Sequence, residues 1–93
     1  DPLADWLSGK LVVRHSDGRL WKSQTLKKLA WCVALLGYGK DVIVTVLEER
    51  DSMTEYNRYA WRNPPWRAAT YDAIASRAIG RHEEWERRQQ AKS

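Results

Sequence analysis

Apolar residues recur every three or four positions in the first part of the chain, which is the spacing of one face of a helix. Residues 2–8 are predicted to form a short helix that begins at a proline and ends at Gly9. Residues 24–36 are predicted to form a longer helix, for which Ser23 is a suitable N-cap. The apolar stripe of this second helix comprises Leu26, Leu29, Ala30, Val33 and Leu36.

Two segments that contain glycine are predicted to be turns. Residues 10–21 include Ser16-Asp17-Gly18 and indicate a loop or a short hairpin. Gly37 and Gly39 follow the second helix and are expected to end it, because glycine is favoured just after a helix C-terminus.

Residues 40–51 carry two conflicting signals. The β-branched run from Val42 to Val46 would suit a strand. Yet the apolar positions also lie at helical spacing, and the following Glu48-Glu49-Arg50 favours a helix. Because the neighbouring segments are helical, we predict a helix here.

The last third of the chain predicts a connection followed by a long helix. Residues 52–65 are expected to be the connection, with one helical turn near Glu55–Trp61. Asn63 is the predicted N-cap of the long helix, with Pro64 and Pro65 in its first turn. The helix then shows one apolar stripe, Tyr71, Ile74, Ala75, Ala78, His82 and Trp85, and the tail RRQQAKS is expected to fray.

These elements predict an all-α fold, a small bundle of four to five helices with a long C-terminal helix. The 93 residues suffice for one domain, here residues 1–93. The chain begins with Asp1-Pro2 and not with methionine, so we expect it to be a piece of a longer protein.

Composition adds an unusual set of aromatic residues and an uneven charge. The chain has six Trp and four Tyr but no Phe, and a net charge of +4. Residues 1–39 hold six Lys/Arg against three Asp/Glu, residues 40–57 hold two against five, and residues 58–81 hold five against one. If the two basic segments meet in space, they form a patch that attracts phosphate.

Few residues suggest catalysis or a cofactor. The single Cys32 and the two histidines are too scattered for a zinc site, so no metal and no cofactor are expected in this domain. His82 lies on the apolar stripe and is interpreted as a packed residue. No apolar run is long enough to span a membrane, and no signal peptide is visible, so a reducing cytoplasm is the expected compartment.

Residues 58–71, RYAWRNPPWRAATY, combine arginines with aromatic rings. Arginine contacts phosphate through two donors at once and stacks on bases, and exposed Tyr and Trp rings stack on unpaired bases. Trp66 falls about 140° from Tyr71 around a helix, so we expect it to be partly exposed. The alternative is that the rings anchor the segment on the bundle while the arginines remain in water.

Residues 21–79 resemble the helical domain that follows the catalytic core in archaeo-eukaryotic-type primase-polymerases of phages and plasmids. The matching parts are Lys22-Ser23, the stripe from Leu26 to Ala30, Gly37-Tyr38, Val42–Leu47, Arg58-Tyr59-Ala60-Trp61-Arg62 and Trp66 through Ile79. The resemblance implies a domain without catalytic residues that engages template DNA, the initiating nucleotide or both during primer synthesis. The polymerase chemistry would belong to an upstream catalytic primase domain, which is then a partner.

The predicted partner is therefore DNA, a single-stranded template above all, and nucleotide binding is left open. The predicted contact residues are Arg14, His15, Arg19, Lys22, Ser23, Lys27, Lys28, Arg58, Tyr59, Arg62, Trp66 and Arg67. Two alternatives remain. One is a free-standing helix-turn-helix regulator, although its recognition helix would carry Val42, Glu48 and Glu49 and suit a major groove poorly. The other is a protein-interaction domain whose surface Trp residues are hot spots.

Overall fold

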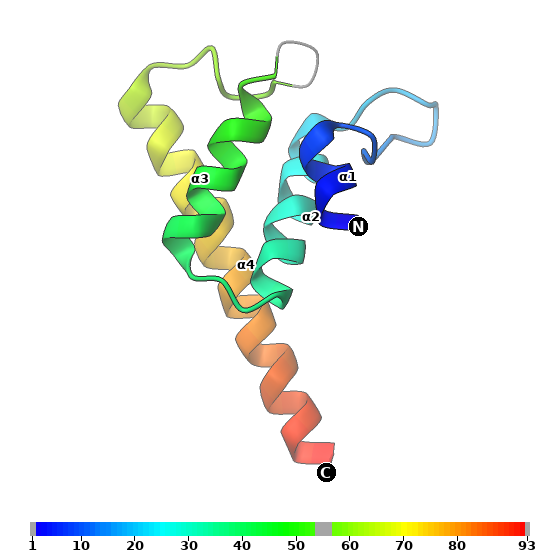
Figure 1. The fold of residues 1–93 in the computed structure, drawn as a ribbon, viewed down its shortest axis with the longest axis vertical. Helices are drawn as coiled ribbons and strands as arrows, with labels where there is room; N and C mark the ends of the chain where they lie inside the picture. The colour runs from blue at the N-terminus through cyan, green and yellow to red at the C-terminus, as the bar shows by residue number, and fades with distance from the viewer. Residues whose placement is uncertain (1, 54–56, 93) are drawn as a thin grey trace.

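The computed structural model describes residues 2–53 and 57–92, and in these residues the chain forms four helices (Figure 1). They are α1 (Pro2–Ser8), α2 (Lys22–Leu35), α3 (Lys40–Asp51) and α4 (Pro64–Lys92). No strand occurs in the described residues, although Arg14 and Leu20 form one isolated antiparallel bridge. The all-α bundle with a long C-terminal helix is thus confirmed.

The core lies where α2, α3 and α4 pack against one another, and α1 packs on α2 and α3. Each of the three long helices contributes a buried stripe to it, and α4 contributes the small residues Ala75 and Ala78. Small side chains at a contact allow helix axes to approach closely. The buried hydrophobic residues are Leu26, Leu29, Ala30, Val33, Ala34, Ile43, Leu47, Tyr71, Ala75 and Ala78.

Residues 40–51 form a helix and not a strand. Ile43 and Leu47, four positions apart, are both fully buried, whereas Val42 is exposed. A strand would place residue 45 on the same face as residues 43 and 47, but Thr45 is exposed, which fits a helical period and not a period of two. Packing against α2 and α4 therefore outweighs the strand preference of the β-branched run.

The start of α2 differs from the prediction. Trp21 occupies the N-cap position without a side-chain cap, and Ser23 lies inside the first turn. Thr25 is not a cap, but it ties the start of α2 to the hairpin: its Oγ1 donates to the carbonyl of Trp21 (2.8 Å) and accepts from the N–H of Val13 (2.9 Å).

Both predicted turns are present. In the hairpin of residues 13–21, the N–H of His15 donates to the carbonyl of Arg19 (2.8 Å), and Gly18 has φ +91°. After α2, Gly37 has φ +90° and its N–H donates to the carbonyl of Ala34 (2.9 Å). Glycine adopts this left-handed region without the cost that a Cβ brings.

The connection to α4 is partly as predicted. Residues 54–56 of the expected helical turn lie outside the described residues, and the described part contains a single hydrogen-bonded turn, from the N–H of Arg62 to the carbonyl of Tyr59 (3.0 Å). Asn63 is the N-cap of α4, as predicted, since its Oδ1 accepts from the N–H of Trp66 (3.0 Å). Pro64 and Pro65 open the helix, where a missing N–H has no cost.

Helix α4 sets the longest dimension of the molecule. Its 29 residues span about 44 Å at 1.5 Å per residue, and the longest axis is 45 Å. Its C-terminal half extends past the other helices (Figure 1). The predicted stripe is therefore only partly core: Tyr71, Ala75 and Ala78 are buried, but Trp85 is 48% exposed because no helix covers it. The tail expected to fray is helical through Lys92.

Candidate nucleic-acid interface

Asp51 at the end of α3 holds the segment that leads into α4. Its carboxylate is fully buried and accepts hydrogen bonds from the backbone N–H groups of Arg58 and Tyr59 and from the hydroxyl of Tyr71. Bonds to a carboxylate are stronger than bonds between neutral groups. Burial, together with the bond to Asp51, raises the pKa of Tyr71 far above its ordinary value, so this hydroxyl stays a donor.

Arg67, one of the predicted contacts, is half-buried and bonded to the connection before α4. Its Nη1 donates to the carbonyls of Ala60 (2.8 Å) and Arg62 (3.2 Å). Two carbonyls of the connection therefore point at one guanidinium of α4. This interaction fixes the backbone on either side of Trp61.

Trp61, Arg62 and Trp66 form a layered group on the surface, here called the Trp–Arg stack. The guanidinium carbon of Arg62 lies 4.2 Å from the ring centroid of Trp61 and 4.4 Å from that of Trp66. Trp61 is 64% exposed and Trp66 is 41% exposed, so the expectation of a partly exposed Trp66 is confirmed. The indole N–H of Trp61 donates to the carbonyl of Arg58 (2.9 Å) and orients the ring.

Tyr59 connects the Trp–Arg stack to the core. Its ring centroid lies 5.7 Å from that of Trp66 and 6.4 Å from that of the buried Tyr71. Arg58 covers the ring of Tyr59, with 4.9 Å between the guanidinium carbon and the centroid. Tyr59 is half-buried, so it supports the stack from below rather than forming an open platform.

The hairpin residues among the predicted contacts are engaged with one another. His15 stacks on Trp21, with 4.4 Å between centroids and 15° between planes. Arg14 donates to the carbonyl of Gly18 (3.0 Å), and Arg19 pairs with Asp17 (2.7 Å). The backbone N–H of Arg19, with its side chain, lowers the pKa of Asp17. These arginines therefore stabilise the turn, although Arg19 remains largely exposed.

The four predicted contacts at the start of α2 diverge in position. Lys22 and Ser23 are half-buried, and Lys27 and Lys28 are exposed. Lys27 lines a groove together with Arg77 and Arg81 of α4. At this groove, residues of the two basic segments lie close together.

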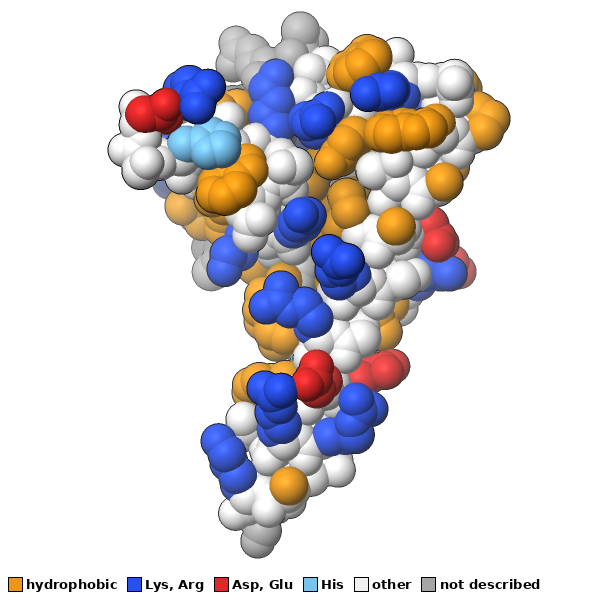
Figure 2. All heavy atoms as spheres, turned by 180° about the vertical axis from the view of Figure 1, so that it is seen from behind, with side chains coloured by type: hydrophobic (Ala, Val, Ile, Leu, Met, Phe, Trp, Pro, Cys, Tyr) orange, Lys and Arg blue, Asp and Glu red, His pale blue; other side chains and the backbone are white. Residues whose placement is uncertain are grey.

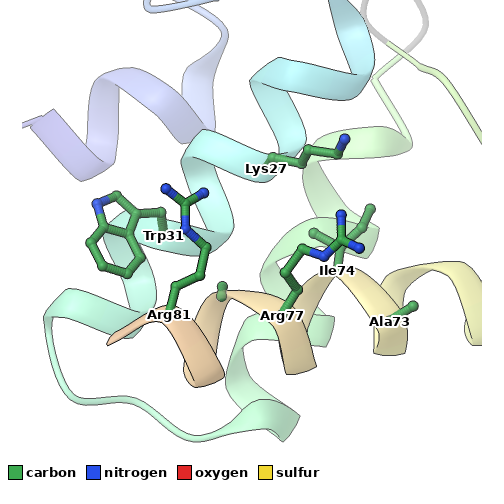
Figure 3. Close-up of a pocket in the computed structure, with 7 residues that line it drawn as sticks. Lys27, Trp31, Ala73, Ile74, Arg77 and Arg81 are labelled. Carbon is green, nitrogen blue, oxygen red and sulfur yellow. The ribbon is translucent and has the colours of Figure 1, made fainter. Parts of the chain in front are cut away.

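A groove of about 230 Å³ lies between α2 and α4 (Figure 3), and the sequence-based prediction did not include it. Its lining residues are Lys27, Trp31, Ala73, Ile74, Arg77, Ala78 and Arg81. The signal was the spacing: residues 27 and 31 on α2, and residues 77 and 81 on α4, are each four apart and share a helix face.

The hairpin and the Trp–Arg stack are placed by the segments that carry them, and basic side chains surround both. The hairpin and the connection before α4 lie at the same end of the bundle, at opposite edges in the view of Figure 1. Seen from behind, basic side chains are spread over this end and along α4 (Figure 2). Positive charge on one face raises the local concentration of a polyanion.

The described residues offer little for other chemistry. They contain no group of three or more His, Cys, Asp or Glu side chains that could hold a metal ion. Burial raises the pKa of the Cys32 thiol, which makes the thiolate less available. Within residues 2–53 and 57–92, no helix is sufficiently long and apolar to cross a bilayer.

Comparison with known proteins adds no relative: no protein-family model, no curated protein and no solved structure matches this chain.

Proposed function

We propose that this chain binds single-stranded nucleic acid, and that it acts as an accessory domain that holds template DNA for a primase-polymerase. The observation that carries the proposal is the Trp–Arg stack, a guanidinium held between two exposed indole rings on the surface. Aromatic rings that only fill the core would be buried. Here Trp61 presents most of its surface to solvent.

The Trp–Arg stack supplies both kinds of interaction that a nucleic acid strand needs. Stacking of a base on an aromatic side chain is worth about 1–3 kcal/mol per base. Among the described residues no carboxylate forms an ion pair with Arg62, so its N–H groups are available to a phosphate. The hydrogen bonds of Asp51 and Arg67 fix the backbone beneath, which limits the entropy cost of binding.

Single-stranded nucleic acid fits better than a duplex. Bases in a duplex already stack on one another and offer no free face to an indole ring. A helix-turn-helix interpretation would place α3 in the major groove, but the exposed residues of α3 include Val42, Glu48 and Glu49. Carboxylates on that surface oppose the phosphate backbone.

The link to primer synthesis rests on the resemblance of residues 21–79 to the helical domain of primase-polymerases. In that arrangement the catalytic carboxylates belong to a preceding domain, and this chain supports it by engaging the template.

The test is binding of a fluorescein-labelled oligo(dT) followed by anisotropy. Trp61→Ala and Arg62→Ala are each expected to weaken binding by roughly tenfold, because each removes an interaction of about 1–3 kcal/mol. Arg87→Ala is the matched control, an exposed arginine near the end of α4 and away from the Trp–Arg stack. Equal weakening in all three variants, or no binding by the unaltered chain, would overturn the proposal and favour a protein-interaction role for the exposed Trp residues.

A further inference from the structure

The α2/α4 groove combines an apolar floor with a basic rim. Ala73, Ile74 and Ala78 of α4 form the floor, and Lys27, Arg77 and Arg81 stand around it. In Figure 3 the side chains of Arg77 and Arg81 extend from α4 toward α2, and the side chain of Lys27 extends from α2. No acidic residue lines this groove.

The positive charge of the rim is not neutralised within the described residues. Nearby carboxylates on α4 are engaged elsewhere: Asp72 pairs with Lys40 (3.0 Å) and Glu84 pairs with Arg88 (2.7 Å). Lys27, Arg77 and Arg81 are exposed and form no ion pair in residues 2–53 and 57–92. The groove therefore complements an acidic ligand.

The shape of the groove argues against a nucleotide or a stacked base. Its volume of about 230 Å³ is below the roughly 300–1,000 Å³ that is usual for small-molecule pockets. The ring of Trp31 is already covered, with the guanidinium carbon of Arg81 at 5.5 Å from its centroid and the ring of His82 at 6.1 Å in an edge contact. A space of this size between alanines and an isoleucine suits one large apolar side chain.

The groove also continues along α4. A second, smaller hollow shares Trp31 and Arg81 with it and adds Glu84, Trp85 and Arg88. Trp85, like Leu36 of the predicted α2 stripe, is a predicted stripe residue that the structure leaves exposed. An extended ligand that fills the first hollow would therefore reach an apolar and mostly basic surface one helical turn further on.

From these observations we propose that the α2/α4 groove docks an acidic peptide segment of a partner protein. One large apolar side chain of the peptide occupies the floor beside Ile74, and flanking carboxylates pair with Lys27, Arg77 and Arg81. Arginine binds a carboxylate through two parallel hydrogen bonds, which gives the peptide a defined register. The site is separate from the Trp–Arg stack and does not depend on its function.

The probe is a fluorescein-labelled peptide of aspartates around a single central phenylalanine, with a second peptide in which alanine replaces the phenylalanine. We expect the first peptide to bind the 93-residue chain and the second to bind at least about tenfold more weakly, because it lacks the buried apolar anchor. Equal affinity for both peptides would mean that charge alone attracts them, and the docking groove would be rejected. Failure of the first peptide to bind would reject it as well.

Variants locate the site. Arg77→Glu is expected to weaken binding of the phenylalanine peptide by about tenfold or more, because an attractive pair becomes a repulsive one. Arg87→Glu makes the same change of charge outside both hollows and is expected to have a small effect. Ala73→Trp fills the floor without changing charge and is expected to abolish binding. A circular dichroism spectrum identical to that of the unaltered chain shows that each variant is folded.

The same variants separate a peptide site from a nucleic acid site. If Arg77→Glu and Ala73→Trp leave the affinity for oligo(dT) within about twofold of the unaltered chain while peptide binding is abolished, the groove is a protein-docking site. If instead Ala73→Trp weakens oligo(dT) binding as much as Arg62→Ala does, the groove belongs to the nucleic acid interface and the proposal is overturned.

Discussion

The hydroxyl of Tyr71 in α4 donates a hydrogen bond to the carboxylate of Asp51 at the end of α3, and both side chains are buried. The same carboxylate accepts the N–H groups of Arg58 and Tyr59. One acidic side chain thus joins two helices to the segment that carries the Trp–Arg stack. The candidate interface and the core are therefore coupled through Asp51.

Replacing Asp51 by alanine is expected to destabilise the fold strongly. Three donors lose their acceptor, and a buried polar group without a partner costs about 1–3 kcal/mol. Asp72→Ala is the control, since Asp72 forms only an exposed pair with Lys40, and such pairs contribute about 1 kcal/mol or less. Urea denaturation measures the free energy of unfolding of the two variants. A destabilisation by Asp51→Ala no greater than that by Asp72→Ala would show that the carboxylate does not hold the segment.

The raised pKa of Tyr71 predicts a decrease of stability in alkali. An unfolded tyrosine ionises near pH 10, whereas the folded chain keeps this proton to higher pH because of burial and the bond to Asp51. Above about pH 10 the unfolded state therefore binds fewer protons than the folded state, and the free energy of unfolding falls as pH rises. Below about pH 10 this contribution is constant. Urea midpoints across the alkaline range should fall less steeply in Tyr71→Phe than in the exposed control Tyr38→Phe.

The two arginines on either side of Pro64 and Pro65 are expected to behave differently. Arg67→Ala removes two bonds to backbone carbonyls and should lower the free energy of unfolding by about 3 kcal/mol, since each bond to a charged group contributes about 1.5 kcal/mol at the low end. Arg62→Ala removes exposed cation–ring interactions, worth about 1 kcal/mol or less each. In thermal melts, Arg67→Ala should therefore have the lower melting temperature of the two variants. If Arg62→Ala melts at a lower temperature than Arg67→Ala, the assignment of roles is wrong.

Two glycines give predictions of opposite sign. Gly37 has φ +90°, so alanine there should cost about 1–2 kcal/mol. Gly80 lies within α4, and a Cβ built on it meets nothing within 4 Å, so alanine should stabilise the helix by about 0.5–1 kcal/mol. Differential scanning calorimetry should show a lower melting temperature for Gly37→Ala and a higher one for Gly80→Ala. A shift of both in the same direction would contradict the account of one of the two glycines.

The periodicity of the chain was sufficient to predict the helices but not their partners. Helical spacing indicated all four helices of the described residues. For the β-branched run of α3 the spacing alone was ambiguous, and the helical neighbours decided the prediction. The spacing could not show that α4 extends beyond the other helices, because Trp85 continues the same apolar stripe although no helix covers it. The N-cap of α2 was misplaced as well: Trp21 holds that position, and its N–H is bound to the carbonyl of Val13 in the hairpin (2.8 Å), a contact that helical spacing does not reveal.

The candidate site was predicted in part. The mixture of rings and arginines in residues 58–67 correctly marked a single cluster, because those residues are close in sequence. The inward role of Arg67 depends on how the connection folds back, which composition does not encode. The groove needed the crossing of α2 and α4, which brings Lys27 beside Arg77 and Arg81 from positions about fifty residues apart in the sequence.

The salt dependence of oligo(dT) binding tests the central claim most directly. If the Trp–Arg stack holds a single strand by its phosphates, the affinity of the unaltered chain should fall linearly on a plot of log affinity against log salt concentration. Arg62→Ala should reduce the magnitude of that slope by about 0.7, the value expected when the protein neutralises one phosphate fewer on a single strand. A slope near zero for the unaltered chain, or a slope that Arg62→Ala leaves unchanged, would contradict the assignment of this surface to nucleic acid.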